Sequence, residues 1–361
     1  MVILFAALLL GQLGEATPLS PIPDENHLQV EVDPRHELLS IVHYISNFRV
    51  EGWRLKTHLD FDYTRRVTEA FLPFKDHPAV KRFEELSEAG FTLSAPMGAM
   101  LHVSGFPELE LVHSMPEGLE KRAGGEEGFR EFLRLLRDFA EQSQFAEFRR
   151  ENRSLYEGMV RRYREKIAGR NYVGILEDYM GTTKESYTVI LNPLLGSFNI
   201  GSKVVREDGT TDIFNISGPK TLDEEGHPVF GSTDGIRNLI WHEFAHAFTN
   251  PLVAEHKEAI DRHAHLFEPM KERMARSGYP QWDICVDEHI VRAINIRLNA
   301  MGISEAEAQR LLESDLKAGF TYVPHLTERL EEYEGNRDAY PTLGHFFPRI
   351  LELFAEMSPG L

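Results

Sequence analysis

Apolar residues recur every three or four positions over most of this chain, which is the repeat of a helix with one buried face. Segments rich in glycine, proline and polar residues separate these stretches. The stretches with helical periodicity are 34–48, 79–88, 127–140, 145–167, 235–250, 256–276, 282–300, 304–318 and 345–357. The pattern therefore predicts a mainly helical protein.

Four short stretches are predicted to be strands, because they are β-branched or apolar and lie between turn residues. They are 28–32, 187–191, 198–205 and 212–216. The last three follow one another closely, and Asp208 and Gly209 form a turn between two of them. We interpret 187–216 as an antiparallel ribbon. Helices around a small antiparallel sheet predict an α+β fold.

The stretch 235–250 is predicted to be a helix that begins after the capping residues 232–234 and ends at Pro251. It contains W-H-E-F-A-H-A-F, in which His242 and His246 are four residues apart. Side chains at this spacing lie on one face of a helix. Both imidazoles can therefore bind one metal ion, and zinc suits such ligands.

Glu243 lies beside the first of these histidines, offset by about 100° around the helix. It can stand near a metal ion without binding it, as a general base that takes a proton from metal-activated water. The remaining residues of the segment are mostly apolar, and unpaired histidines buried among them would cost several kcal/mol. A bound metal ion removes that cost. The alternative is a solvated helix in which the spacing is a coincidence.

A catalytic zinc ion has three protein ligands and one open position, so a third ligand is expected. Cys285 is the one cysteine of the chain, which excludes an intrachain disulfide and a cysteine-based zinc site. The extended motif with a glycine and a third histidine is also excluded, because Thr249 and Leu252 occupy those positions. The third ligand is therefore expected to be a carboxylate on a following helix.

The candidates are Glu255, Glu258, Glu268, Glu272, Asp287 and Glu288. We favour Glu288, which flanks an apolar stripe of the predicted helix 282–300, because a carboxylate there needs a buried partner. The stripe consists of Ile284, Val291, Ile294 and Leu298. Asp287 is the next candidate, and an ion pair with Arg292 is the alternative for Glu288. Asp287 or Asp283 could instead orient a ligand histidine.

The net charge of −18 argues against a nucleic-acid partner, because phosphate binding needs a basic surface. Residues 2–10 form an apolar run that is too short to span a bilayer, and Gly14 and Ala16 follow with the spacing of a signal-peptidase site. We therefore predict a signal peptide over 1–16 and an exported protein. The alternatives are a wrongly assigned start codon, with a cytoplasmic location, and a buried N-terminal helix. No stable membrane span is predicted.

The sequence H-E-F-A-H, followed downstream by D-E-H-I-V-R-A, resembles the gluzincin class of zinc metallopeptidases. A closer resemblance is to a family of bacterial domains of unknown function with metallopeptidase-like motifs. Three segments carry it: W-H-E-F-A-H-A-F-T-N-P, E-H-I-V-R-A and Y-E-G-N-R-D-A-Y-P-T, at 241–251, 288–293 and 333–342. The family-like stretch starts as early as V-D-P-R-H-E-L-L-S-I-V at 32–42. The resemblance implies that His242, His246 and Glu288 bind zinc and that Glu243 is the base.

We therefore predict a zinc-dependent peptidase acting on a peptide or protein, with a mainly helical region over 17–170 and a zincin-like catalytic region over 171–361. Tyr333, Arg337 and Tyr340 are candidates to stabilise an oxyanion, and ordinary packing is the alternative role for them. Two other functions stay open. One is a zinc hydrolase acting on non-peptide amides or esters, and the other is a non-catalytic binding module stabilised by its metal. The sequence does not fix the cleavage preference or the oligomeric state.

Overall fold

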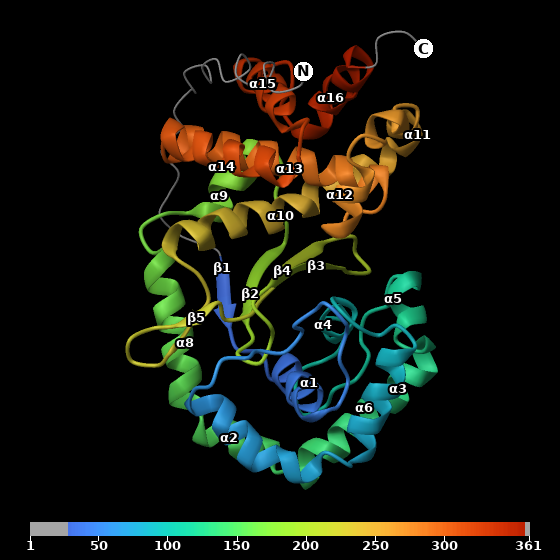
Figure 1. Ribbon diagram of the computed structural model, residues 1–361, viewed down its shortest axis with the longest axis vertical. Coiled ribbons are helices and arrows are strands. Elements are labelled where there is room, and N and C mark those ends of the chain that lie inside the picture. Colours follow the sequence, from blue (N-terminus) through green and yellow to red (C-terminus); the bar gives the residue numbers. More distant parts are fainter. Residues whose placement is uncertain (1–27, 358–361) are drawn as a thin grey trace. The chain divides into compact units, whose positions relative to one another are not determined.

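The computed structural model describes residues 28–357 (Figure 1), so the predicted signal peptide lies outside the described residues. The chain divides into two compact units. The unit that we call the sheet unit comprises Leu28–Gly169 and Lys184–Arg237. The helical unit comprises Arg170–Thr183 and the chain from Asn238 onward. The strands at 186–217 belong to the sheet unit.

Four strands form one mixed sheet with the order β1-β2-β4-β3. They are β1 (Leu28–Glu31), β2 (Ser186–Leu191), β3 (Asn199–Val205) and β4 (Thr211–Ser217). The prediction of an antiparallel sheet was correct for β3 and β4 but wrong for the other two pairs, because β2 runs parallel to both β1 and β4. The tight turn at Asp208 and Gly209 joins β3 to β4, so β2 is left to pair with the other edge of β4. A second, two-stranded sheet pairs β5 (Thr221–Leu222) with β6 (Pro228–Val229).

Helix α1 (Pro34–Ile45) lies at the centre of the helices in the sheet unit (Figure 1). Most of its residues are buried, and it packs against α2, α3, α4 and α6. The other helical segments are α2 (Asp62–Phe71), η1 (Leu72–Phe74), α3 (Pro78–Glu88), α4 (Ala95–Met100), α5 (Glu117–Arg122), α6 (Gly125–Gln142), α7 (Phe145–Glu151) and α8 (Arg153–Ile167). The predicted helix 145–167 is thus two helices, which meet at Asn152.

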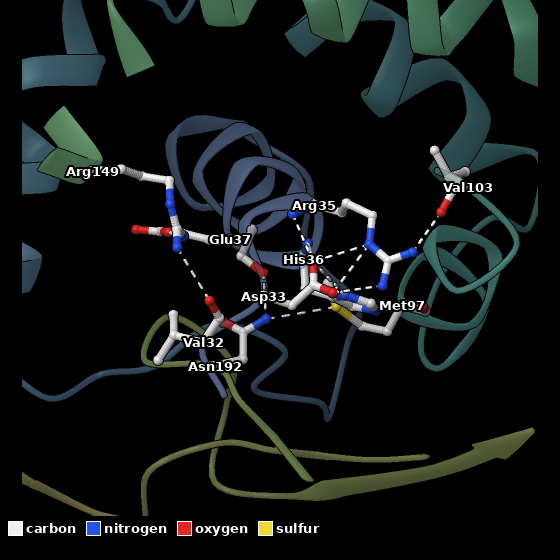
Figure 2. Close-up of polar contacts among 10 residues, drawn as sticks. Val32, Asp33, Arg35, His36, Glu37, Met97, Val103, Arg149 and Asn192 are labelled. Carbon is white, nitrogen blue, oxygen red and sulfur yellow. Dashed lines mark hydrogen bonds and ion pairs between the residues drawn. The ribbon is translucent and has the colours of Figure 1, made fainter. Parts of the chain in front are cut away.

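Buried charges hold the start of α1, at its cap and in its first turn (Figure 2). Asp33 caps the helix by accepting hydrogen bonds from the backbone N–H groups of Arg35 and His36, at 2.7 and 3.3 Å. Glu37 is 2 % exposed and forms an ion pair with Arg149. Two buried tyrosines, Tyr63 and Tyr156, donate their hydroxyls to the same carboxylate at 2.5 Å each. Burial raises the pKa of Glu37, and these partners oppose that rise.

The helical unit is built around α13 (Trp282–Gly302), which packs against α9, α11, η2, α14 and α15. Its other elements are α9 (Tyr172–Met180), α10 (Thr233–Glu255, from Asn238 onward), α11 (Lys257–Asp261), η2 (Ala264–Phe267), α12 (Lys271–Arg276), α14 (Glu305–Ala318), α15 (Val323–Gly335) and α16 (Leu343–Glu356). The predicted helix 256–276 is thus three short segments. Among residues 28–357, no helix is long and apolar enough to span a membrane.

Two predictions about these helices were wrong. Helix α10 does not end at Pro251 but continues through it to Glu255. A proline removes only one backbone hydrogen bond, and the burial of Val253 beyond it favours the longer helix. Ile284 does not belong to the buried stripe of α13, because it is 41 % exposed. The buried face there runs through Cys285 and Glu288 instead.

We expect Glu37→Ala to lower the free energy of unfolding by about 3–5 kcal/mol, because it leaves Arg149 without its counter-charge and two buried hydroxyls without an acceptor. Urea unfolding monitored by circular dichroism measures this loss. The matched control is Glu157→Ala, which breaks an exposed pair with Arg153 on α8 and should cost less than about 0.5 kcal/mol. Equal losses in the two variants would contradict the importance of the buried cluster.

Candidate metal centre

Two helices of the helical unit, α10 and α13, carry the residues predicted to bind metal. Trp241 and Phe244 on α10 are fully buried, and the Trp241 indole N–H donates to the carbonyl of Tyr172 at 3.0 Å. The Asn299 side-chain amide on α13 donates to the Asn238 side-chain oxygen on α10 at 2.9 Å. These contacts fix the rotation of α10 and the position of α13 beside it.

The structure brings His242, His246 and Glu288 together, as predicted. His242 Nε2 lies 3.5 Å from Glu288 Oε1, and His246 Nε2 lies 3.5 Å from Glu288 Oε2. The two imidazole rings are 5.0 Å apart between centroids and nearly perpendicular. One potential ligand atom from each residue lies within 4.8 Å of the others. Zinc–ligand bonds of about 2.0–2.1 Å in a tetrahedron place neighbouring ligand atoms about 3.3 Å apart, so this donor set fits zinc.

Asp287 orients one of the two histidines. Its Oδ2 lies 2.6 Å from Nδ1 of His246, which leaves Nε2 of that ring facing Glu288. A carboxylate on the far nitrogen of a ligand histidine is the usual support for a metal site. The geometry therefore favours the orienting role that the sequence left open for Asp287. Asp283 does not share it, because it forms an ion pair with Lys257 at 3.0 Å.

The two histidines titrate in opposite directions, although both face Glu288. Burial lowers the pKa of His242 to about 4. Burial also opposes protonation of His246, but the hydrogen bonds to Asp287 and Glu288 outweigh it and raise the pKa to about 10. Burial alone would raise the pKa of Glu288, yet the nearby histidines and Arg292 hold it well below its usual value. These shifts favour a protonated His246, a neutral His242 and an ionised Glu288 near neutral pH.

Glu288 has further partners besides the histidines. Arg292 Nη2 lies 2.6 Å from Glu288 Oε1, so the ion pair considered as an alternative exists together with the cluster. The Tyr279 hydroxyl also contacts Glu288 and Arg292, and burial raises its pKa. Sequence analysis missed Tyr279, because it lies in a turn before α13 where no periodicity connects it to the site.

The residues proposed as oxyanion donors have other contacts. The Tyr333 hydroxyl donates to the carbonyl of Tyr179 at 2.6 Å, and Arg337 Nη1 donates to the same carbonyl at 2.6 Å. The ring of Tyr340 packs edge-on against Phe346. These contacts hold the end of α9, which favours the packing role that we considered as the alternative.

The remaining candidates differ in exposure. Glu243 directly follows His242 on α10 and is half-buried. Four carboxylates that we considered as third ligands are exposed: Glu255, Glu258, Glu268 and Glu272. Ion pairs account for Glu268 and Glu272, with Lys271 and Arg276 respectively. Of the six candidates, Glu288 is therefore the buried carboxylate that faces both histidines.

Comparison with known proteins identifies the family of the chain. The family described as Domain of unknown function (DUF4932) matches residues 28–353. The chain belongs to this family. The match confirms the sequence-based resemblance to a family of unknown function, and the family description gives no activity. No curated protein and no solved structure matches the chain. The function of this DUF4932 member must therefore be argued from its site.

We expect zinc binding to tighten with pH, because His246 must lose its proton before Nε2 can bind a metal. The pKa of His246 is raised to about 10 and that of His242 is lowered to about 4. At a pH between these two values, the binding of one zinc ion therefore releases one proton. The Kd for zinc should fall about a hundredfold from pH 6 to pH 8 in competition with a chelator. Asp287→Asn, which lowers the pKa of His246, should flatten the dependence. A constant Kd over this range would contradict the protonation state.

If Glu288 is the predicted third ligand, we expect Glu288→Gln to weaken zinc binding by more than about 100-fold, because it removes the negative charge of the carboxylate. Elemental analysis after dialysis and chelator competition measure the effect, and circular dichroism checks the fold. The matched control is Asp283→Asn on the same helix, whose partner is Lys257 and which should retain zinc. Equal zinc content in both variants would exclude Glu288 as a ligand.

Proposed function

We propose that this protein is a zinc-dependent peptidase, which hydrolyses peptide bonds with metal-activated water and a glutamate base. The observation that carries the proposal is the spacing of the donors: two imidazole nitrogens on α10 each lie 3.5 Å from one buried carboxylate on α13. Asp287 behind His246 supports it further, since such a contact fixes the ring of a ligand histidine.

The number of donors favours catalysis over a structural metal. Structural zinc sites use four protein ligands, whereas catalytic sites use three and keep one position open. Among the described residues, the group of histidine and acidic side chains suited to a metal has three members: His242, His246 and Glu288. When bound at such a site, zinc lowers the pKa of a water molecule to about 7 and polarises a substrate carbonyl.

Glu243 is the proposed general base. Its place next to His242 on α10 turns its carboxylate about 100° away from the ligand face, so it stands beside the metal ligands and is not one of them. Its carboxylate takes a proton from the attacking water. It then delivers that proton to the nitrogen of the leaving amine, so that the base is restored after each turnover. His246, held by Asp287, keeps its Nε2 directed at the site throughout.

The resemblance to gluzincins agrees with this assignment. That class combines an H-E-x-x-H helix with a glutamate ligand from a following helix. Here α10 provides the first part and Glu288 on α13 the second. The resemblance also implies peptide bonds as the substrate.

We expect Glu243→Gln to keep zinc but to lower kcat/KM for a peptide by about 10²–10⁴-fold, because general-base catalysis contributes that much. Denatured casein and p-nitrophenyl acetate serve as peptide and ester substrates, with zinc content measured in parallel. Glu258→Gln, an exposed carboxylate beyond the helix, is the control and should leave the rate unchanged.

Three outcomes would contradict parts of this proposal. Full activity of Glu243→Gln would remove the base assignment. Turnover of the ester without any turnover of casein would favour the non-peptide hydrolase. A wild-type protein that binds zinc but turns over neither substrate would favour a binding module.

A further inference from the structure

We propose that Arg292 is a positioning residue that acts through Glu288 and keeps the affinity of the site for its metal low. This inference rests on the proposed metal site and concerns its tuning. Arg292 Nη2 lies 2.6 Å from Glu288 Oε1, which is also the oxygen closest to His242. A metal ion bound by the two histidines and Glu288 must therefore share that carboxylate with a guanidinium.

The guanidinium cannot easily leave this carboxylate, because contacts hold it on three sides. Its Nη1 lies 2.5 Å from Oδ1 of Asp315 on α14. Its central carbon stacks on the ring of Phe320 at 3.8 Å from the centroid. Tyr279 contacts it from the turn before α13. A planar guanidinium with a carboxylate at each end and an aromatic ring on its face is oriented by all of these contacts.

A fixed positive charge beside a metal ligand has a predictable effect. It lowers the negative potential that an incoming cation meets, and the effect is large where both groups are buried. The side chains of Glu288 and Arg292 are 3 % and 22 % exposed, so water screens the pair weakly. The same guanidinium compensates the buried carboxylate and holds it in place. Arg292 thus stabilises Glu288 but lowers the affinity of the site for a metal.

A substitution at Asp315 should change the metal affinity in the opposite direction to one at Arg292. Its carboxylate, 13 % exposed, neutralises part of the charge of Arg292 without reaching the ligands itself. Removing the charge of Arg292 should therefore strengthen metal binding, and removing the charge of Asp315 should weaken it. A merely structural role predicts that both substitutions weaken binding, because either would loosen Glu288.

The experiment measures the Kd for Zn²⁺ of the full chain by chelator competition at one pH, with circular dichroism to check the fold. We expect Arg292→Gln to bind zinc about 10–100-fold more tightly and Asp315→Asn about tenfold more weakly, which is the usual range for groups behind a ligand. Arg292→Lys keeps the charge and should stay near the wild-type value. Arg297→Gln is the matched control, because Arg297 is a buried arginine of α13 that pairs with Glu331 and Glu334 instead.

Zinc affinity that is equal or weaker in Arg292→Gln would overturn this inference, as would a shift of Asp315→Asn in the same direction. If Arg292→Gln does not fold, Arg292→Met, which also removes the charge, replaces it. Tighter zinc binding in that variant supports the proposal, and equal or weaker binding overturns it. If the proposed metal site itself is wrong, the result is a different one. The wild type then binds no zinc, or Glu288→Gln binds zinc as tightly as the wild type.

Discussion

The helical unit is organised around one buried carboxylate. Glu288 is 2 % exposed in the middle of α13, where a lone negative charge would cost far more than the helix gains from packing. Two imidazoles and a guanidinium surround it, and each comes from a position fixed by apolar contacts or hydrogen bonds. This requirement explains why histidines occupy the apolar face of α10 and why an arginine follows one turn after Glu288. A metal ion at the same place would satisfy the same charge.

The charges around this carboxylate nearly cancel. Without a metal, three acids (Asp287, Glu288 and Asp315) face two cations, protonated His246 and Arg292, which leaves one negative charge. Binding of a divalent ion with release of the proton of His246 would bring the group to neutrality. The charged groups around Glu288 therefore compensate one another within the fold.

Glu37 in the sheet unit shows the other way to bury a carboxylate. Its partners are a guanidinium, which forms an ion pair with it, and two tyrosine hydroxyls, which donate hydrogen bonds to it. No imidazole is among these partners. All of these groups donate to Glu37, so none of them offers a cation an imidazole nitrogen beside the carboxylate. The contrast separates a structural carboxylate from a candidate ligand. The deciding feature is the presence of neutral nitrogen atoms directed at the acid, which His242 supplies because burial keeps its pKa low.

The sequence by itself determined the local features of this protein. The four strands of the main sheet and many of the helices followed from periodicity, and the pairing of His242 with His246 followed from the helical repeat, because both depend on neighbours within a few residues. Periodicity did not predict helices α2, α4, α5, α9 and α15. The structure places Glu288, which the sequence favoured as the third ligand, 3.5 Å from each histidine, although Ile284, part of the argument for it, is exposed. The parallel pairing of β2, the continuation of α10 past Pro251 and the places of Tyr279, Asp315 and Phe320 were decided only by the tertiary structure. Each depends on contacts between segments far apart in the chain, and no spacing rule within one segment encodes which distant groups packing brings together.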